Sequence, residues 1–183
     1  HALGLAVPLV VAVSTALAAG NGLLIRNRGA FEGARKLQAV IFDKTGTLTL
    51  GQPQLTAFLV PGGEDDAEPL AAAASLQSGS EHPLARAVVA AATEKGLRIS
   101  APDALQAVPG KGSTGVLGQQ HYCIGSLRWM QELGAPLGAL QAQAKTLQDQ
   151  GATVSAIARR EGATPQTARY RLLALMAFAD APK

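Results

Sequence analysis

One carboxylate followed by hydroxyl residues and a glycine is the part of this sequence best suited to chemistry. Asp43 directly follows the apolar run Ala39–Phe42, and the next residues are Lys44, Thr45, Gly46, Thr47, Leu48 and Thr49. The apolar run predicts a buried strand of a parallel sheet, whose carboxyl end is where open α/β sheets place their reactive groups. There a carboxylate can attack a phosphoryl group, while backbone N–H groups and hydroxyls hold the phosphate oxygens. A divalent cation would offset the crowded negative charge.

The whole string resembles the phosphorylation signature of P-type ATPases, ion pumps whose catalytic core has the haloacid-dehalogenase fold. The resemblance implies that Asp43 accepts the γ-phosphate of ATP and that Asp43 and the main chain of Thr45 bind Mg²⁺. It also implies that Lys44, Thr45 and Thr47 line the phosphate site. A strand that ends in an ordinary polar turn is the structural alternative, because Asp, Thr and Gly are common turn residues.

The first 25 residues contain a long uncharged segment. No charged residue occurs between Ala2 and Ile25, and roughly 20 apolar residues suffice to span a bilayer. Basic residues follow this segment, as expected for a cytoplasmic flank and in the reverse order to a secretory signal peptide. We therefore expect a partial transmembrane helix over residues 1–25, with a buried helix of a soluble protein as the alternative.

The segment from His1 to Pro8 resembles the one after the intramembrane Cys-Pro of heavy-metal pumps, in their Cys-Pro-His subgroup. The resemblance implies that His1 is a ligand of a transported copper or related heavy-metal ion, and imidazole suits copper. It also implies an integral, multi-pass protein of the cell membrane with cytoplasmic catalytic domains. Its partners would be the lipid bilayer and the rest of the pump, namely the actuator domain and the other membrane helices. An N-terminal histidine can also simply mark the start of a fragment.

Composition narrows the class of protein further. The 183 residues are long enough for a membrane segment and one domain. The net charge of +3 is too small to indicate nucleic acid as a partner. Cys123 is the single cysteine, which excludes an intramolecular disulfide and a thiolate cluster and favours a small buried side chain.

The pattern downstream of the string predicts an α/β fold with an α+β insertion. Helices are expected over 29–37, 67–77, 83–95, 126–133 and 137–150, and strands over 39–42, 54–60, 104–108, 113–117, 120–124, 154–158 and 172–178. By the resemblance, this is a partial haloacid-dehalogenase-like phosphorylation domain, interrupted by an antiparallel-sheet nucleotide-binding domain flanked by helices and preceded by one membrane helix. The expected divisions are 1–25 (membrane helix), 26–50 (stalk and start of the phosphorylation domain), 51–174 (nucleotide-binding domain) and 175–183 (return to the phosphorylation domain). We expect 39–49 and 179–183 to be loosely held, because one exposed strand is not a stable sheet.

Two short motifs further along the chain can hold a nucleotide. Pro83 is favoured in the first turn of a helix, which puts His82 at the helix entrance, where an imidazole can stack on a planar base. Gly110 and Gly112 allow the backbone to approach a ligand closely, and Lys111 between them can neutralise phosphate. Each motif is weak alone, because a histidine before such a proline is usually a cap and the lysine spacing is not that of a P-loop.

Together, Ser-Glu-His-Pro-Leu and Pro-Gly-Lys-Gly resemble the nucleotide-binding domain of heavy-metal P-type ATPases. The resemblance implies that His82 contacts adenine, that Gly110 and Gly112 border the nucleotide, and that Glu81 and Lys111 belong to the same site. Two residues depart from the family pattern: Gln77 replaces a frequent acidic residue five positions before the histidine, and Ser126 replaces the asparagine of a Gly-Asn pair. We therefore expect weak nucleotide binding.

One segment could be mistaken for a DNA-binding motif. Residues 154–170 carry arginines and the turn rhythm of a helix-turn-helix, but the family has a variable hairpin there, and we expect a solvated loop with no nucleic acid bound.

Three functions stay open at this point: a fragment of an ATP-driven copper-type pump that works through an aspartyl-phosphate, a soluble haloacid-dehalogenase-type phosphatase or phosphotransferase, and an isolated ATP-binding module without turnover. Those phosphatases usually have a second Asp, a general acid, two residues after the nucleophile. This chain has Thr45 at that position, and the absence of the general acid favours a long-lived phosphoenzyme over fast hydrolysis.

Overall fold

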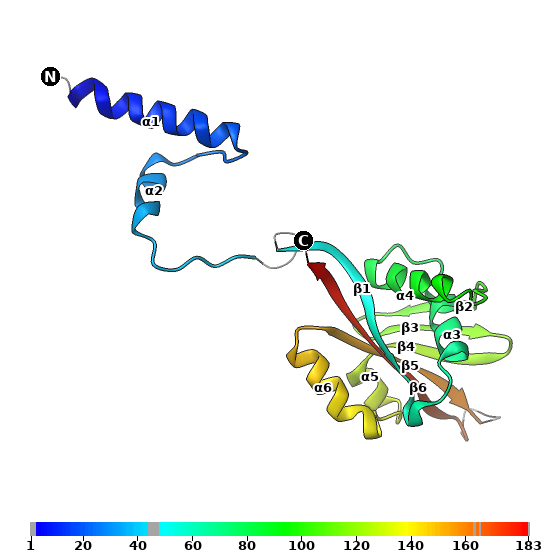
Figure 1. The fold of residues 1–183 in the computed structure, drawn as a ribbon. Coiled ribbons are helices and arrows are strands. Elements are labelled where there is room, and N and C mark those ends of the chain that lie inside the picture. The colour runs from blue at the N-terminus through cyan, green and yellow to red at the C-terminus, as the bar shows by residue number, and fades with distance from the viewer. Residues whose placement is uncertain (1–2, 44–47, 163, 165, 183) are drawn as a thin grey trace. The chain divides into compact units, whose positions relative to one another are not determined.

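The computed structural model describes residues 3–43, 48–162, 164 and 166–182, and the chain divides into two compact units, His1–Phe42 and Asp43–Lys183 (Figure 1). Each unit is described by itself. The division of the chain into stalk, phosphorylation and nucleotide-binding domains stays a prediction.

The first unit is helical. Helix α1 covers Leu3–Gly20, α2 covers Arg28–Gly33, and a 3-10 turn covers Ala34–Lys36. Asn27 caps α2, because its side-chain oxygen accepts the backbone N–H of Ala30 at 3.1 Å. The helix expected over 29–37 is thus confirmed.

The expected transmembrane helix over 1–25 is not confirmed. In the part of the chain that the structure describes, no helix is both long and apolar enough to cross a membrane. Helix α1 has 18 residues and ends at Gly20, which makes it about 27 Å long against a hydrocarbon core of about 30 Å.

The expected strand over Ala39–Phe42 is wrong. These residues lie outside helices and strands, and the side chains of Val40, Ile41 and Phe42 are 63%, 96% and 62% exposed. A strand needs a neighbour that pairs with its N–H and C=O groups, and none of the described strands pairs with this run. Asp43 therefore does not follow a strand here.

The second unit is built on a six-stranded sheet in the order β1-β6-β5-β4-β3-β2, with every neighbouring pair antiparallel. The strands are β1 (Thr49–Leu59), β2 (Asp103–Val108), β3 (Gly112–Leu117), β4 (Gln120–Ser126), β5 (Thr153–Glu161) and β6 (Arg169–Pro182). All six strands expected for this region are confirmed. Residues 179–182 were expected to be loosely held, but they belong to β6 and pair with β1, where Pro182 is opposite Thr49.

Helices cover both faces of this sheet (Figure 1). The helices are α3 (Ala67–Gln77), α4 (Pro83–Glu94), α5 (Leu127–Glu132) and α6 (Gln141–Asp149), with 3-10 turns at Pro61–Gly63 and Gly138–Leu140. Helices α3 and α4 bury Tyr122, Ile124 and Ile157 on one face. Helices α5 and α6 bury Cys123 and Ala156 on the other. This alternation along β4 and β5 gives each face its own apolar core.

The two ends of the sheet differ in composition. We call one the glycine end: β1, β3 and β5 begin there, at Thr49, Gly112 and Thr153, and β2, β4 and β6 end there. At the other, the arginine end, β5 and β6 form the hairpin that pairs Glu161 with Arg169. This hairpin confirms that residues 154–170 are not a helix-turn-helix.

Candidate functional site

The motif Pro-Gly-Lys-Gly forms the turn between β2 and β3 at the glycine end. The N–H of Lys111 donates to the carbonyl of Val108 at 3.0 Å, and Gly110 has a φ of 71°. Proline at the second position and a left-handed glycine at the third are typical of a type II turn. A Cβ built on Gly110 would meet no described atom within 4 Å, so this residue borders open space that a ligand can enter.

Gly112 has a different reason to be glycine. A Cβ there would lie 2.0 Å from the carbonyl oxygen of Ile124, and one on Gly125 would lie 2.1 Å from the carbonyl oxygen of Lys111. The same carbonyl of Lys111 accepts the N–H of Ser126 at 2.9 Å. At the paired ends of the antiparallel neighbours β3 and β4, Gly112 is opposite Gly125, and the two backbones approach too closely there for a side chain on either residue.

Ser126, one of the departures from the family pattern, has a structural role. Its Oγ accepts the N–H of Trp129 at 3.2 Å and so caps helix α5. A serine hydroxyl therefore replaces the asparagine without leaving the helix uncapped.

Lys111 is paired with helix α5. Its Nζ lies 2.5 Å from Oε2 of Glu132, and Nε of Arg128 lies 3.6 Å from Oε1 of the same carboxylate. The hydrogen bond from Lys111, followed by the charges of Lys111 and Arg128, holds the pKa of Glu132 below its ordinary value.

His82 caps helix α4 at the glycine end. Its Nδ1 accepts the N–H of Leu84 at 3.2 Å, and its own N–H donates to Oγ of Ser80 at 3.2 Å. This bond occupies Nδ1, so Nε2 is the ring nitrogen through which His82 could contact a ligand. Glu81 forms an ion pair with Arg86. The cap expected from Pro83 is therefore present, and it leaves the ring exposed.

A cavity of about 300 Å³ lies beside His82. Its lining comes from four elements and the loop before β5: Gly51, Pro53, His82, Pro83, Leu84, Gly151, Thr153, Phe178, Ala179 and Asp180. All of the strand residues in this set belong to the glycine end, so His82 lies over the same end as the β2–β3 turn.

Antiparallel helices bring the remaining predicted residues to this end. Lys95, just after α4, pairs with Asp66, just before α3, at 2.9 Å, so α3 runs toward the glycine end and α4 away from it. The predicted cofactor-binding residues thus lie toward the same end of the sheet, although His82 alone among them lines the cavity: Gln77, Glu81, His82, Gly110, Lys111 and Gly112. The starts of β5 and β3, two strands apart, are separated by about 10 Å, a gap that an extended nucleotide can bridge.

The predicted phosphorylation residues are not brought into this site. Asp43 is exposed and lies outside any helix or strand. Lys44, Thr45 and Thr47 lie outside the described residues, as does His1. Within the described ranges, no group of three or more His, Cys, Asp or Glu side chains could hold a metal ion.

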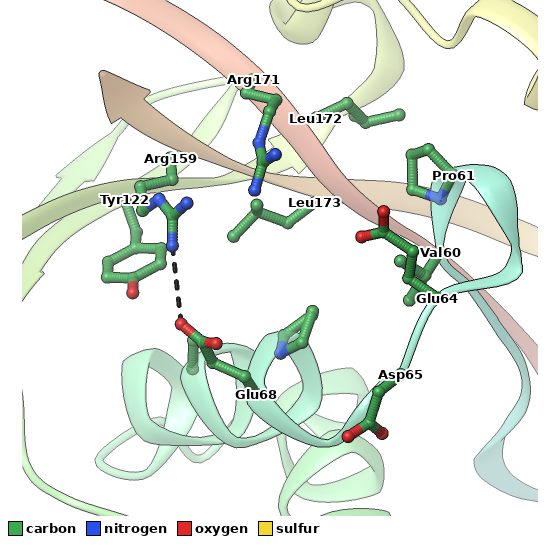
Figure 2. A pocket seen from close by; sticks show the side chains of 12 residues that line it. Val60, Pro61, Glu64, Asp65, Glu68, Tyr122, Arg159, Arg171, Leu172 and Leu173 are labelled. Atoms are coloured by element: carbon green, nitrogen blue, oxygen red, sulfur yellow. Dashed lines mark hydrogen bonds and ion pairs between the residues drawn. The ribbon is translucent and has the colours of Figure 1, made fainter. Parts of the chain in front are cut away.

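The sequence analysis missed a larger cavity at the arginine end, of about 430 Å³ (Figure 2). Arg159 and Arg171 point into it from the sheet, and the carboxylate of Glu68 faces Arg159 from α3 at 3.5 Å. Glu161 pairs with Arg159 at 3.5 Å and with Arg171 at 3.1 Å. The available signal was the run Arg159-Arg160-Glu161, which had been interpreted as a possible nucleic-acid feature, whereas Arg159 pairs with Glu68 and Glu161 of this chain.

The comparisons with known proteins fit this architecture. Residues 37–181 match the family described as haloacid dehalogenase-like hydrolase, and the chain belongs to that family.

The curated proteins to which this chain is similar are P-type ATPases. The chain is 48% identical over 154 residues to the copper-exporting P-type ATPase B of Archaeoglobus fulgidus, covering 84% of this chain and 22% of that protein. It is 43% identical over 153 residues to the copper-exporting P-type ATPase of Legionella pneumophila, covering 84% and 21%. The chain thus spans about a fifth of the length of the curated relatives it matches.

A solved structure shares the fold. The crystal structure of a zinc-transporting PIB-type ATPase in the E2.Pi state matches with a TM-score of 0.68 and 29% identity, over 94% of this chain and 26% of that one. The resemblance inferred from the sequence motifs is confirmed: the chain has a haloacid-dehalogenase-like domain whose homologues are copper-exporting P-type ATPases.

Proposed function

We propose that this chain is the nucleotide-binding region, with the start of the phosphorylation region, of an ATP-driven heavy-metal pump whose cargo is copper. The observation that supports the proposal is the 48% identity to a copper-exporting P-type ATPase, in a chain whose His82 and β2–β3 turn lie toward the same end of the sheet.

The nucleotide would lie along the glycine end. The exposed ring of His82 offers a planar face and its Nε2 to adenine. Gln77 is half-buried and offers a neutral amide, which can donate and accept at once. The open space at Gly110 lets the phosphates approach the backbone of the turn. A neutral amide in place of a carboxylate supports weak binding.

Phosphoryl transfer would take place in the whole pump. A carboxylate oxygen of Asp43 attacks the γ-phosphorus of ATP, the bond from that phosphorus to the β–γ bridging oxygen breaks, and ADP leaves. The product is an aspartyl-phosphate. Lys44, Thr45 and Thr47 would line the phosphate site. Mg²⁺, with Asp43 and Thr45 among its ligands, would neutralise charge on the phosphates.

The remaining partners follow from the same proposal. His1 would be a ligand of the transported copper ion, and the lipid bilayer, the actuator domain and the other membrane helices would complete the pump. The protein would be integral to the cell membrane, with the catalytic domains in the cytoplasm and no nucleic-acid partner.

Radiolabelling of the full-length protein tests this function. Incubation with ATP labelled at its γ-phosphate should give an acid-stable label that hydroxylamine removes, because an acyl-phosphate is cleaved by that nucleophile. Asp43→Asn should abolish the label, whereas Asp65→Asn, an exposed aspartate elsewhere, should retain it. A full-length protein that acquires no label, or the same label after Asp43→Asn, would overturn the proposal.

A second candidate is an isolated ATP-binding module without turnover. One observation favours it. The sheet of the second unit has an apolar core on each face, which a stable binding domain needs, whereas Asp43 follows no strand that would position it for catalysis. The chain alone should then bind ATP and release no phosphate. Phosphate release from a simple phosphate ester by this chain would instead indicate a phosphatase of the haloacid-dehalogenase type.

A further inference from the structure

We propose that Glu132 competes with the phosphates of the nucleotide for Lys111, so that this ion pair sets how strongly the glycine end prefers a nucleoside triphosphate over the nucleoside alone. The proposal rests on the proposed nucleotide site and adds to it a residue, Glu132, that the sequence motifs do not contain.

The contact itself is close and accessible. The Nζ of Lys111 and Oε2 of Glu132 are 2.5 Å apart, and the two side chains are 44% and 42% exposed. A pair so open to solvent can exchange partners, because exposed ion pairs contribute little net free energy.

The backbone of Lys111 is held by two hydrogen bonds that do not involve its side chain. Its N–H donates to Val108 at 3.0 Å, and its carbonyl accepts the N–H of Ser126 at 2.9 Å. A change of partner therefore requires only rotation of the lysine side chain, with no movement of the turn. The neighbouring residue, Gly110, borders the open space where phosphates would approach.

Glu132 keeps a cation beside it when Lys111 leaves. The Nε of Arg128 lies 3.6 Å from Oε1, and the Arg128 side chain is 90% exposed, one turn earlier on α5. A glutamate carboxylate is ionised at neutral pH whether or not Lys111 is beside it. Glu132 thus competes for Lys111 with a single negative charge. A triphosphate carries more negative charge than a monophosphate and therefore displaces Glu132 from Lys111 more effectively.

The test is calorimetric titration of the full chain with adenosine, AMP and a non-hydrolysable ATP analogue. Glu132→Gln should raise the affinity for the ATP analogue about three- to fivefold, leave adenosine unchanged, and lose most of its effect at high salt. Lys111→Gln should remove the preference for the triphosphate. The double variant Lys111→Gln/Glu132→Gln should show no gain over Lys111→Gln.

Matched variants separate competition from a structural role. Arg128→Gln removes the other cation beside Glu132 and should change the affinity for the analogue less than twofold. Glu132→Ala serves as a second variant should the glutamine form fold poorly. If Glu132→Gln changes the affinities for adenosine and for the ATP analogue by the same factor, so that their ratio is unchanged, this inference is overturned and the nucleotide site stays in place. Absence of binding of all three ligands by the unsubstituted chain would overturn the nucleotide site as well.

Discussion

The two ends of the same six-stranded sheet carry cavities of opposite character. At the arginine end the cavity is the larger, about 430 Å³ against about 300 Å³, but Arg159, Arg171 and Glu68 pair among themselves and with Glu161. At the glycine end the groups near open space are a backbone turn and the ring of His82. Ion pairs occur at both ends, since Lys111 pairs with Glu132 at the glycine end. The glycine end differs in its β2–β3 turn, where Gly110 borders open space, and in the exposed ring of His82.

The largest effect expected concerns the backbone packing of the glycine end. Gly112→Ala should lower the free energy of unfolding by about 3 kcal/mol, because its Cβ must displace backbone atoms of β4. Gly110→Ala should lower it by only about 1 kcal/mol, since only the left-handed φ opposes it. Urea unfolding can be followed by the fluorescence of Trp129, the single tryptophan. Equal losses in the two variants would contradict the close backbone approach of β3 and β4 at Gly112.

The next effect contrasts one histidine at each end. His82→Ala should weaken binding of an ATP analogue about tenfold, because contact between a base and an aromatic ring is lost. His121→Ala removes an exposed histidine near the start of β4 and should leave the affinity unchanged. Calorimetric titration measures both. An equal loss in both variants would remove the distinction between the two ends.

A smaller effect is expected from the ion pairs of the arginine end. Arg159→Gln removes contacts to Glu68 and Glu161 at a side chain that is 21% exposed, and should lower the free energy of unfolding by about 1 kcal/mol. Affinity for the ATP analogue should not change. A nucleotide affinity that falls in this variant would indicate that the arginine-end cavity takes part in binding.

The smallest effect is a pH dependence at the glycine end. The pKa of Glu132 is lower in the folded chain, so its pairing stabilises the fold above the ordinary glutamate pKa, and the contribution is lost as the pH falls through the lowered value. The difference in urea midpoint between the unsubstituted chain and Glu132→Gln should be present at neutral pH and disappear in acid. A difference that grows on acidification would contradict the lowered pKa.

Most of the second unit could be predicted because local signals and tertiary packing agree there. Pro83 set the start of α4, and the alternation along β4 and β5 gave strands with one face in each core. Glycines such as Gly110 and Gly112 indicated the turns between strands. The residues of the candidate site come from motifs and stay a prediction, and the sheet topology places the β2–β3 turn and the cavity beside His82 toward the same end.

The errors have a common physical cause. The run 39–42 has the composition of a buried strand, but a strand forms only with a pairing neighbour, and none of the described strands provides one. The ion pairs of the arginine end join residues far apart in sequence, such as Glu68 and Arg159, and no local pattern reports such pairs. Glu132 was overlooked for the same reason: it approaches Lys111 only after β3, β4 and α5 have packed.

Nuclear magnetic resonance of the ¹⁵N-labelled chain, titrated with an ATP analogue, tests the central claim most directly. The account predicts that amide shifts concentrate at the glycine end, at Gln77, His82, Gly110 and Gly112, and that the amides of Arg159 and Arg171 do not move. Shifts centred on the arginine end, or no shift at His82 and Gly110 at saturating analogue, would contradict it.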